Sequence, residues 1–144
     1  MKLMIKTLVF GFVTAAAGIA FAQQASVASV IARQALMKSQ GGAVKVLGGM
    51  AAGKTAFDAA AAEAARVALA DDAGKIVVAF EQNEADPESE AKPEIWTNLT
   101  DFAAKAEALK VAASAMDTTT VEGVQAGMAG VGGACSACHK AYRL

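Results

Sequence analysis

Apolar side chains recur at every third or fourth position along most of this chain, which is the period of an amphipathic α-helix. Four helices are expected, over about 27–50, 58–81, 93–116 and 119–142. The clearest stripe lies in the third segment and alternates spacings of four and three along Ile95, Leu99, Phe102, Ala106, Leu109, Ala113 and Met116. This pattern favours an all-α fold, an antiparallel up-down-up-down four-helix bundle.

Polar and helix-breaking residues mark where these helices begin. Asp58, or Thr55 with Asp58 three residues later, is a candidate N-cap of the second helix, and Pro93 suits the first turn of the third. Thr119, with Glu122 three residues later, forms a capping-box start for the fourth helix. The segment 81–94 carries six acidic residues and two prolines, so we expect a loop there. That loop is either solvated or a docking site for a basic partner.

The first 22 residues have the pattern of a cleaved signal peptide. Lys2 and Lys6 give a basic start, residues 8–21 are apolar and small, and Ala20-Phe21-Ala22 fits a cleavage site before Gln23. An uncleaved membrane anchor is the alternative, but the apolar run is short and rich in alanine. We therefore expect export to the periplasm, and one domain over residues 23–144.

The charge balance excludes one class of partner. The whole chain has 13 Lys and Arg against 14 Asp and Glu. Removal of the signal segment with Lys2 and Lys6 leaves 11 basic against 14 acidic residues. No basic excess remains that would attract nucleic acid.

The most informative motif is Cys135-Ser136-Ala137-Cys138-His139. A C-x-x-C-H sequence is the attachment signature of a c-type haem, in which each thiol bonds one vinyl group and the imidazole ligates the iron. A thioredoxin-like dithiol would need a strand-to-helix turn, and a zinc site would need four ligands where the chain offers two Cys and one His. A structural disulfide would leave His139 unexplained. We therefore expect one covalent haem c.

Both cysteines fall on the apolar stripe of the fourth helix, which places the haem inside the bundle. That stripe comprises Val121, Val124, Met128, Val131, Cys135, Cys138 and Tyr142. Gly130, Gly132 and Gly133 precede the motif and would let the macrocycle and a neighbouring helix approach the backbone. On the first helix, Gly41 and Gly48 indicate either a flat, bulky group against that face or close helix packing.

At its C-terminal motif the chain resembles the class II c-type cytochromes, the cytochrome c′ group, which end in C-x-x-C-H-x-x-Y-R. Three further pieces are similar to the family pattern: Gly132-Gly133, Arg33-Gln34-Ala35-Leu36-Met37 and Lys92-Pro93-Glu94-Ile95-Trp96. The resemblance covers essentially the whole chain after the signal segment. It implies a four-helix bundle with the haem bound near its C-terminal end.

The resemblance also implies roles for individual residues. It implies two thioether bonds and a proximal iron ligand, supplied by Cys135, Cys138 and His139. It further implies contacts to the haem or its propionates from Arg33 and Gln34. Arg143 lies one helical turn after His139, so it is either a basic group near the proximal pocket or a solvated side chain.

Met37 is the residue on which the function depends. In one branch of the family a methionine of the first helix is the sixth iron ligand, and the protein carries electrons. In the other branch the iron is five-coordinate and binds nitric oxide or carbon monoxide, so that Met37 would only pack over an open site. His139 is the only histidine, which excludes bis-histidine ligation within one chain. The other methionines expected in the mature chain, Met50, Met116 and Met128, are most simply core side chains.

The preferred interpretation is an electron carrier with His139 and Met37 as axial ligands. An enzyme is not expected, because a peroxidase-like site would need a polar distal acid or base. The implied partners are redox proteins of a bacterial respiratory or photosynthetic chain, with nitric oxide or carbon monoxide as the alternative ligands. Both a single bundle and a homodimer paired through the first helices remain open.

Overall fold

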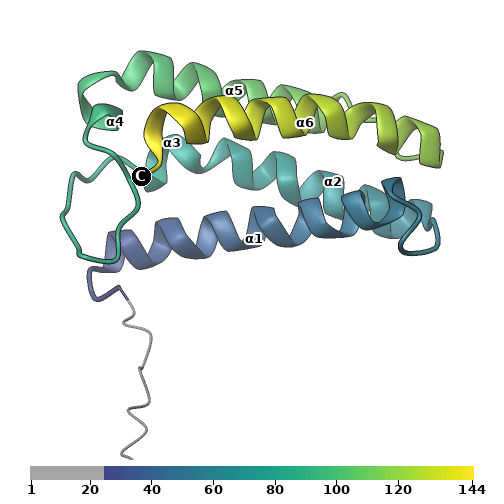
Figure 1. The fold of residues 1–144 in the computed structure, drawn as a ribbon, viewed down its shortest axis with the longest axis horizontal. Helices are drawn as coiled ribbons and strands as arrows, with labels where there is room; N and C mark the ends of the chain where they lie inside the picture. Colours follow the sequence, from purple (N-terminus) through teal and green to yellow (C-terminus); the bar gives the residue numbers. More distant parts are fainter. Residues whose placement is uncertain (1–24) are drawn as a thin grey trace, which may run out of the picture.

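The computed structural model describes residues 25–144, and this part of the chain folds into four long and two short helices (Figure 1). The long helices are α1 (Ala28–Ala51), α2 (Ala59–Gly74), α5 (Leu99–Ser114) and α6 (Val121–Tyr142). The short ones are α3 (Ile76–Ala79) and α4 (Glu94–Thr97). The predicted signal peptide, residues 1–22, lies outside the described residues. Among residues 25–144, no helix has the length and apolar character needed to cross a membrane.

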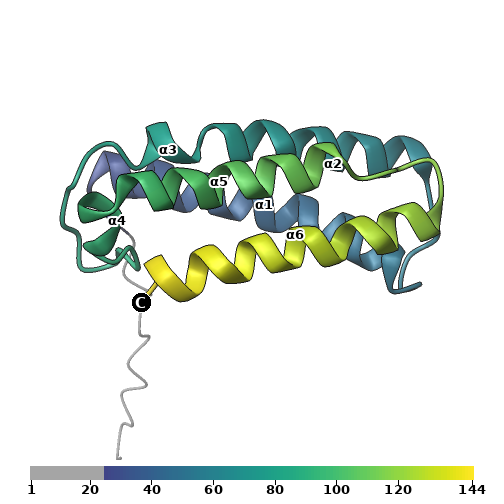
Figure 2. The same cartoon turned by 90° about the horizontal axis from the view of Figure 1, so that it is seen from above.

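The long helices form the predicted antiparallel bundle. Helix α1 packs on α2 and α6, and α5 packs on the same two helices, so the four close into a ring. Successive long helices run in opposite directions (Figures 1 and 2). The end of α6 therefore lies at the same end of the bundle as the start of α1, together with α3 and α4. The haem motif belongs to this end.

Two expected helices are broken once each. The second expected helix is interrupted at Lys75, whose N–H bonds the carbonyl of Asp72 three residues earlier, in a tightened turn after Gly74. The third is interrupted at Asn98, where φ is −137° and ψ is 50°, outside the helical region. Both breaks place a short helix beside the end of the bundle that carries the haem motif.

The predicted helix starts are right in one case and wrong in another. Asp58 caps α2 by accepting hydrogen bonds from the N–H groups of Ala60 at 2.9 Å and Ala61 at 3.0 Å. The capping box Thr119–Glu122 is wrong by one residue, because Thr120 is the N-cap of α6 and accepts from Gly123 N at 3.0 Å. Thr119 instead donates from its hydroxyl to Asp117 at 2.7 Å. A run of three threonines offers equivalent caps, and only the path of the preceding turn selects one.

The core is built from a few large aliphatic side chains between many alanines. Alanine favours helix formation and lets the helix backbones approach closely. The fully buried large side chains are Leu47, Leu69, Ile95, Val30, Val124 and Val131.

We expect Leu69→Ala to lower the free energy of unfolding by about 2–5 kcal/mol, because the substitution leaves a cavity in the core. Leu69 lies on α2 and is 0 % exposed. Denaturant unfolding of the haem-loaded protein measures the effect. The control is Val111→Ala, whose side chain is 57 % exposed and whose removal should change stability by at most about 0.5 kcal/mol. Equal stabilities of the two variants would contradict this placement of the core.

The acidic segment between α3 and α4 is a loop, as predicted, but it is not merely solvated. Asp86 is buried, and its carboxylate accepts hydrogen bonds from Ser26 N at 2.8 Å and Val27 N at 3.0 Å. These are free N–H groups at the start of α1, so Asp86 caps that helix from a distant part of the sequence. Glu81, Glu84 and Glu90 of the same segment are exposed.

The same contacts give a pH dependence. The backbone N–H groups of Val27, Glu88 and Ser26 hold the pKa of Asp86 below its usual value. A depressed carboxyl pKa stabilises the fold above the unfolded-state pKa of about 3.9, and this stabilisation is lost as the pH falls through the folded-state pKa. Asp86→Asn should therefore be less stable than wild type at neutral pH, and the difference should shrink in acid. Thermal unfolding across pH measures it, with Asp71→Asn on the exposed surface of α2 as the control. A difference that stays constant down to acid pH would contradict the assignment.

Candidate haem site

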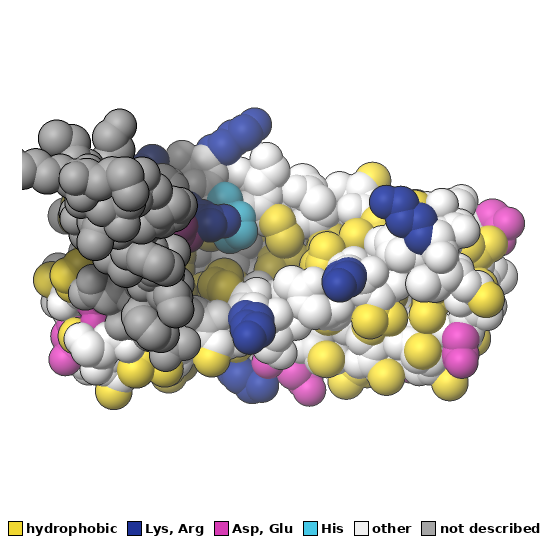
Figure 3. All heavy atoms as spheres, turned by 60° about the horizontal axis from the view of Figure 1, so that its bottom comes forward, with side chains coloured by type: hydrophobic (Ala, Val, Ile, Leu, Met, Phe, Trp, Pro, Cys, Tyr) yellow, Lys and Arg dark blue, Asp and Glu magenta, His cyan; other side chains and the backbone are white. Residues whose placement is uncertain are grey.

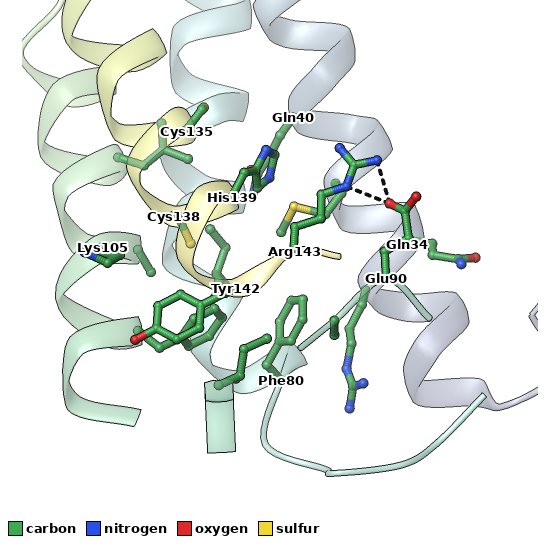
Figure 4. A pocket seen from close by; sticks show the side chains of 18 of the residues that line it. Gln34, Gln40, Phe80, Glu90, Lys105, Cys135, Cys138, His139, Tyr142 and Arg143 are labelled. Carbon is green, nitrogen blue, oxygen red and sulfur yellow. Dashed lines mark hydrogen bonds and ion pairs between the residues drawn. The ribbon is translucent and has the colours of Figure 1, made fainter. Parts of the chain in front are cut away.

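A cavity of about 590 Å³ opens at the end of the bundle where α6 finishes. Side chains of α1, α5 and α6 form its walls, and Ser89, Glu90 and Ala91 of the acidic loop close one side. Figure 3 shows the histidine side chain exposed beside hydrophobic side chains, with basic side chains close to it. Apolar side chains make up most of the walls, and single polar side chains lie between them (Figure 4). Such a cavity suits a large, mostly apolar ligand with a few polar attachment points.

The motif residues Cys135, Cys138 and His139 all line this cavity from the last turns of α6. Spacings of three and four residues place the three side chains on one helix face. Both cysteines are half-buried and free. Burial raises the pKa of both thiols, whereas a reactive dithiol would require lowered pKa values. The raised thiol pKa values therefore do not favour a haem-free redox dithiol.

The surroundings of His139 favour its neutral imidazole. Burial, followed by the charge of Arg143, lowers the pKa of its imidazole. The neutral imidazole is the form that binds a metal. Within residues 25–144, no group of three His, Cys, Asp or Glu side chains is placed to hold a metal ion.

The wall contributed by α1 contains Met37, which is half-buried and lines the cavity. Gly41, one turn later, also lines the cavity, and a Cβ placed there would meet no atom within 4 Å. Gly48 differs, because a Cβ placed there would lie 3.7 Å from Met128 Cε. Gly41 therefore faces the ligand cavity, whereas Gly48 faces Met128 of α6, where a Cβ would make an ordinary van der Waals contact.

The glycines before the motif have only part of the predicted role. Gly130, Gly132 and Gly133 do not line the cavity. A Cβ on Gly130 would lie 3.6 Å from Ala112 Cβ, whereas Gly132 and Gly133 are exposed, with no atom within 4 Å of such a Cβ. The expectation that they let the macrocycle approach is therefore wrong, whereas Gly130 does face the neighbouring helix α5, as expected.

Arg33 lines the cavity from α1 but is bound mainly to the chain itself. It is 3 % exposed, and its guanidinium lies over the rings of Phe80, at 5.1 Å, and Trp96, at 5.2 Å. Its Nε donates to the carbonyl of Ala79 at 3.0 Å, and its Nη2 donates to that of Gln82. Its Nη1 is buried without a partner. Burial lowers the pKa of Arg33, and Glu84 opposes this shift.

Gln34 and Arg143 are placed at the rim of the cavity (Figure 4). The Gln34 amide donates to the carbonyl of Glu88 at 2.8 Å. Arg143 forms an ion pair with Glu90, with Nε at 2.7 Å and Nη2 at 2.5 Å from the same carboxylate oxygen. Arg143 is thus ion-paired beside His139, and the alternative of a purely solvated side chain is not supported.

Sequence reasoning missed a polar cluster beside the cavity, which Asp101 and Lys105 of α5 form with Tyr142 of α6. The Tyr142 hydroxyl donates to Asp101 at 2.6 Å, and this bond raises the pKa of Tyr142 to about 12. Lys105 lines the cavity and pairs with the other oxygen of Asp101 at 3.4 Å. The spacing of four residues between Asp101 and Lys105 was a readable signal of a helix-surface pair.

Comparison with known proteins identifies the family. The family model described as Cytochrome C′ matches residues 28–143, almost all of the described chain. The chain belongs to the cytochrome c′ family. A cytochrome c-556 from Agrobacterium tumefaciens (strain apple 185) is 38 % identical over 120 residues, covering 78 % of this chain and 92 % of the relative.

Solved structures of cytochrome c′ agree with the fold. The cytochrome c′ of Rhodopseudomonas palustris has a TM-score of 0.75 at 29 % identity, covering 83 % of this chain and 98 % of that one. A nitric oxide complex of a cytochrome c prime variant from Alcaligenes xylosoxidans has a TM-score of 0.71 at 26 % identity, covering 80 % and 93 %. The cofactor of this cytochrome c′ family member is one covalent haem c.

The residues around the cavity fit that cofactor. Two thiols and an imidazole share one helix face, and the remaining walls are mainly apolar. Among the described residues, two buried side-chain nitrogens lack a hydrogen-bond partner, and both belong to this cavity: Arg33 Nη1 and Gln40 Nε2. Buried donors require acceptors, and a haem with two propionates brings acceptors into the cavity.

Proposed function

We propose that this protein is an exported electron carrier whose haem is attached through Cys135 and Cys138 and ligated by His139 and Met37. The observation that supports the proposal is that Met37 of α1 and His139 of α6 both line one cavity. The haem iron supplies reversible one-electron exchange between its ferric and ferrous states. The chain supplies the ligands, the enclosure and the charges around it.

Met37 and His139 suit a carrier, because thioether sulfur and imidazole bind both oxidation states and methionine raises the reduction potential. The apolar walls between them include Val30, Val44 and Leu109. Such side chains have no dipoles that must reorient when the charge changes. They therefore favour fast electron exchange over catalysis.

Arg33, Gln34 and Arg143 have different parts in this proposal. Arg33 offers its unpartnered Nη1 to a propionate, while its other bonds hold the loop after α3 in place. Arg143 acts as part of a pair with Glu90, so its net charge toward the haem is small. The Gln34 amide is already bonded to Glu88 O, which limits it to packing or a second, weaker contact.

The second candidate function is the binding of nitric oxide or carbon monoxide at a five-coordinate iron. Two observations favour it: Gly41 leaves space beside Met37, and the Alcaligenes xylosoxidans relative is a nitric oxide complex. In this case Met37 would pack over an open coordination position.

Visible spectra of the exported protein, oxidised and reduced, with and without nitric oxide, separate the two functions. A sharp low-spin α band in the reduced protein that nitric oxide hardly changes supports the carrier. A broad high-spin spectrum that shifts at once on addition of the gas supports the gas-binding function and overturns Met37 ligation.

Export, cellular location and partners complete the proposal. Cleavage after Ala22 would deliver residues 23–144 to the periplasm, where redox proteins of a respiratory or photosynthetic chain are the expected partners. The mass of the purified protein tests the cleavage, since it should equal residues 23–144 plus one haem. A mass that includes residues 1–22 would contradict it.

A further inference from the structure

Gln40 is a polar side chain inside an apolar wall of the cavity. It lies on α1, is 7 % exposed and lines the same cavity as Met37 and the haem motif (Figure 4). Its Nε2 is buried and has no hydrogen-bond partner. An unpaired buried amide is costly, so its presence in a well-packed helix wall requires an explanation.

Several other polar side chains of the cavity have partners within the chain. Gln34 donates to Glu88 O, Arg143 pairs with Glu90, and Lys105 pairs with Asp101. Arg33 has partners for two of its three nitrogens. The Gln40 amide nitrogen has none within residues 25–144, and a group that fills the cavity can supply an acceptor.

The position of Gln40 along α1 limits what that acceptor is. Met37 lies one turn before Gln40, and Arg33 lies seven residues, or about 10 Å of helix, before it. Arg33 and Gln40 therefore stand on either side of Met37 along the same helix face. Gln40 therefore lies on the far side of Met37 from Arg33, the residue that would hold a propionate.

We propose that Gln40 raises the reduction potential of the haem. Its amide N–H directs the positive end of its dipole into the haem cavity. Reduction transfers one electron from an external donor to the ferric haem and lowers the haem charge by one, with no proton taken from Gln40. A fixed donor dipole in a low-dielectric cavity stabilises the electron-richer state. Hydrogen bonding and burial around the haem are recognised determinants of its potential.

The inference rests on the proposed attachment of the haem in this cavity and does not require that Met37 ligates the iron. The two proposals are tested by different measurements. The near-infrared spectrum tests ligation by Met37, and the midpoint potential tests the effect of Gln40. If the wild-type protein lacks the sulfur-to-iron band, Met37 ligation fails while the effect of Gln40 is still measured.

The test is a spectroelectrochemical titration of the haem-loaded protein and its Gln40→Leu variant. Leucine fills similar space without a donor. We expect the equilibrium constant for reduction to fall by up to about tenfold, which for a one-electron couple is about 59 mV. The oxidised spectrum should be unchanged, because the iron ligands are the same.

The matched control is Gln125→Leu. Gln125 is an exposed glutamine of α6 whose amide donates to Ala51 O at 2.8 Å, outside the cavity, so its replacement should leave the potential unchanged. A Gln40→Leu potential equal to that of wild type overturns the proposal. If Gln40→Leu fails to hold haem, Gln40→Ala is measured instead, because it removes the donor without introducing a charge. A lower potential than wild type supports the proposal, and an equal or higher one overturns it.

Discussion

Replacing both Cys135 and Cys138 by serine is expected to yield a chain that carries no covalent haem. A serine hydroxyl does not add to a vinyl group as a thiol does, and these are the only two cysteines of the sequence. The intact mass of the denatured wild-type chain should include one haem, and that of the double variant should lack it. Each single variant should retain the haem through one thioether and show a shifted reduced α band.

The control for this experiment lies between the two cysteines. Ser136 is exposed on α6 and does not line the cavity, so Ser136→Ala should keep both the covalent haem and the wild-type spectrum. Covalent haem in the double serine variant, or its loss in Ser136→Ala, would contradict attachment through the C-x-x-C pair.

Met37→Ala is expected to convert a low-spin haem protein into a high-spin one that binds nitric oxide. Alanine removes the proposed sixth ligand without introducing another. In the wild type, the gas binds only the small fraction of molecules whose Met37 has dissociated. If that fraction is below about a tenth, the variant should bind nitric oxide at least about tenfold more tightly. Gas titration of the reduced protein, followed in the visible spectrum, measures the difference.

Met128→Ala is the matched control for that prediction. Met128 is a half-buried methionine of α6 that contacts Gly48 and does not line the cavity. Its replacement should leave spin state and gas affinity unchanged. If Met37→Ala and Met128→Ala behave alike, Met37 is not the ligand that distinguishes the two functions.

The parts of the fold that depend on neighbouring residues were accessible from the sequence. The helix stripes, the cap at Asp58 and the C-x-x-C-H motif all involve contacts within about one helical turn. The choice between Thr119 and Thr120 failed because both offer the same cap, and the turn that distinguishes them depends on Asp117. Local pattern therefore predicts the helices and their number better than their exact ends.

The remaining features depend on pairs far apart in the chain. Arg33 bonds the carbonyls of Ala79 and Gln82, and Asp86 caps the start of α1, each across more than forty residues of sequence. No local pattern encodes such partners. The different environments of Gly41 and Gly48 likewise arise from what the neighbouring helices place opposite them.

The measurement that tests the proposed function most directly is the near-infrared absorption of the oxidised wild-type protein. Ligation by Met37 and His139 predicts a weak sulfur-to-iron band, which Met37→Ala abolishes and Met128→Ala preserves. Absence of that band in the wild type, together with a high-spin visible spectrum, would show that Met37 only lines an open site. The protein would then be a gas-binding member of its family and not an electron carrier.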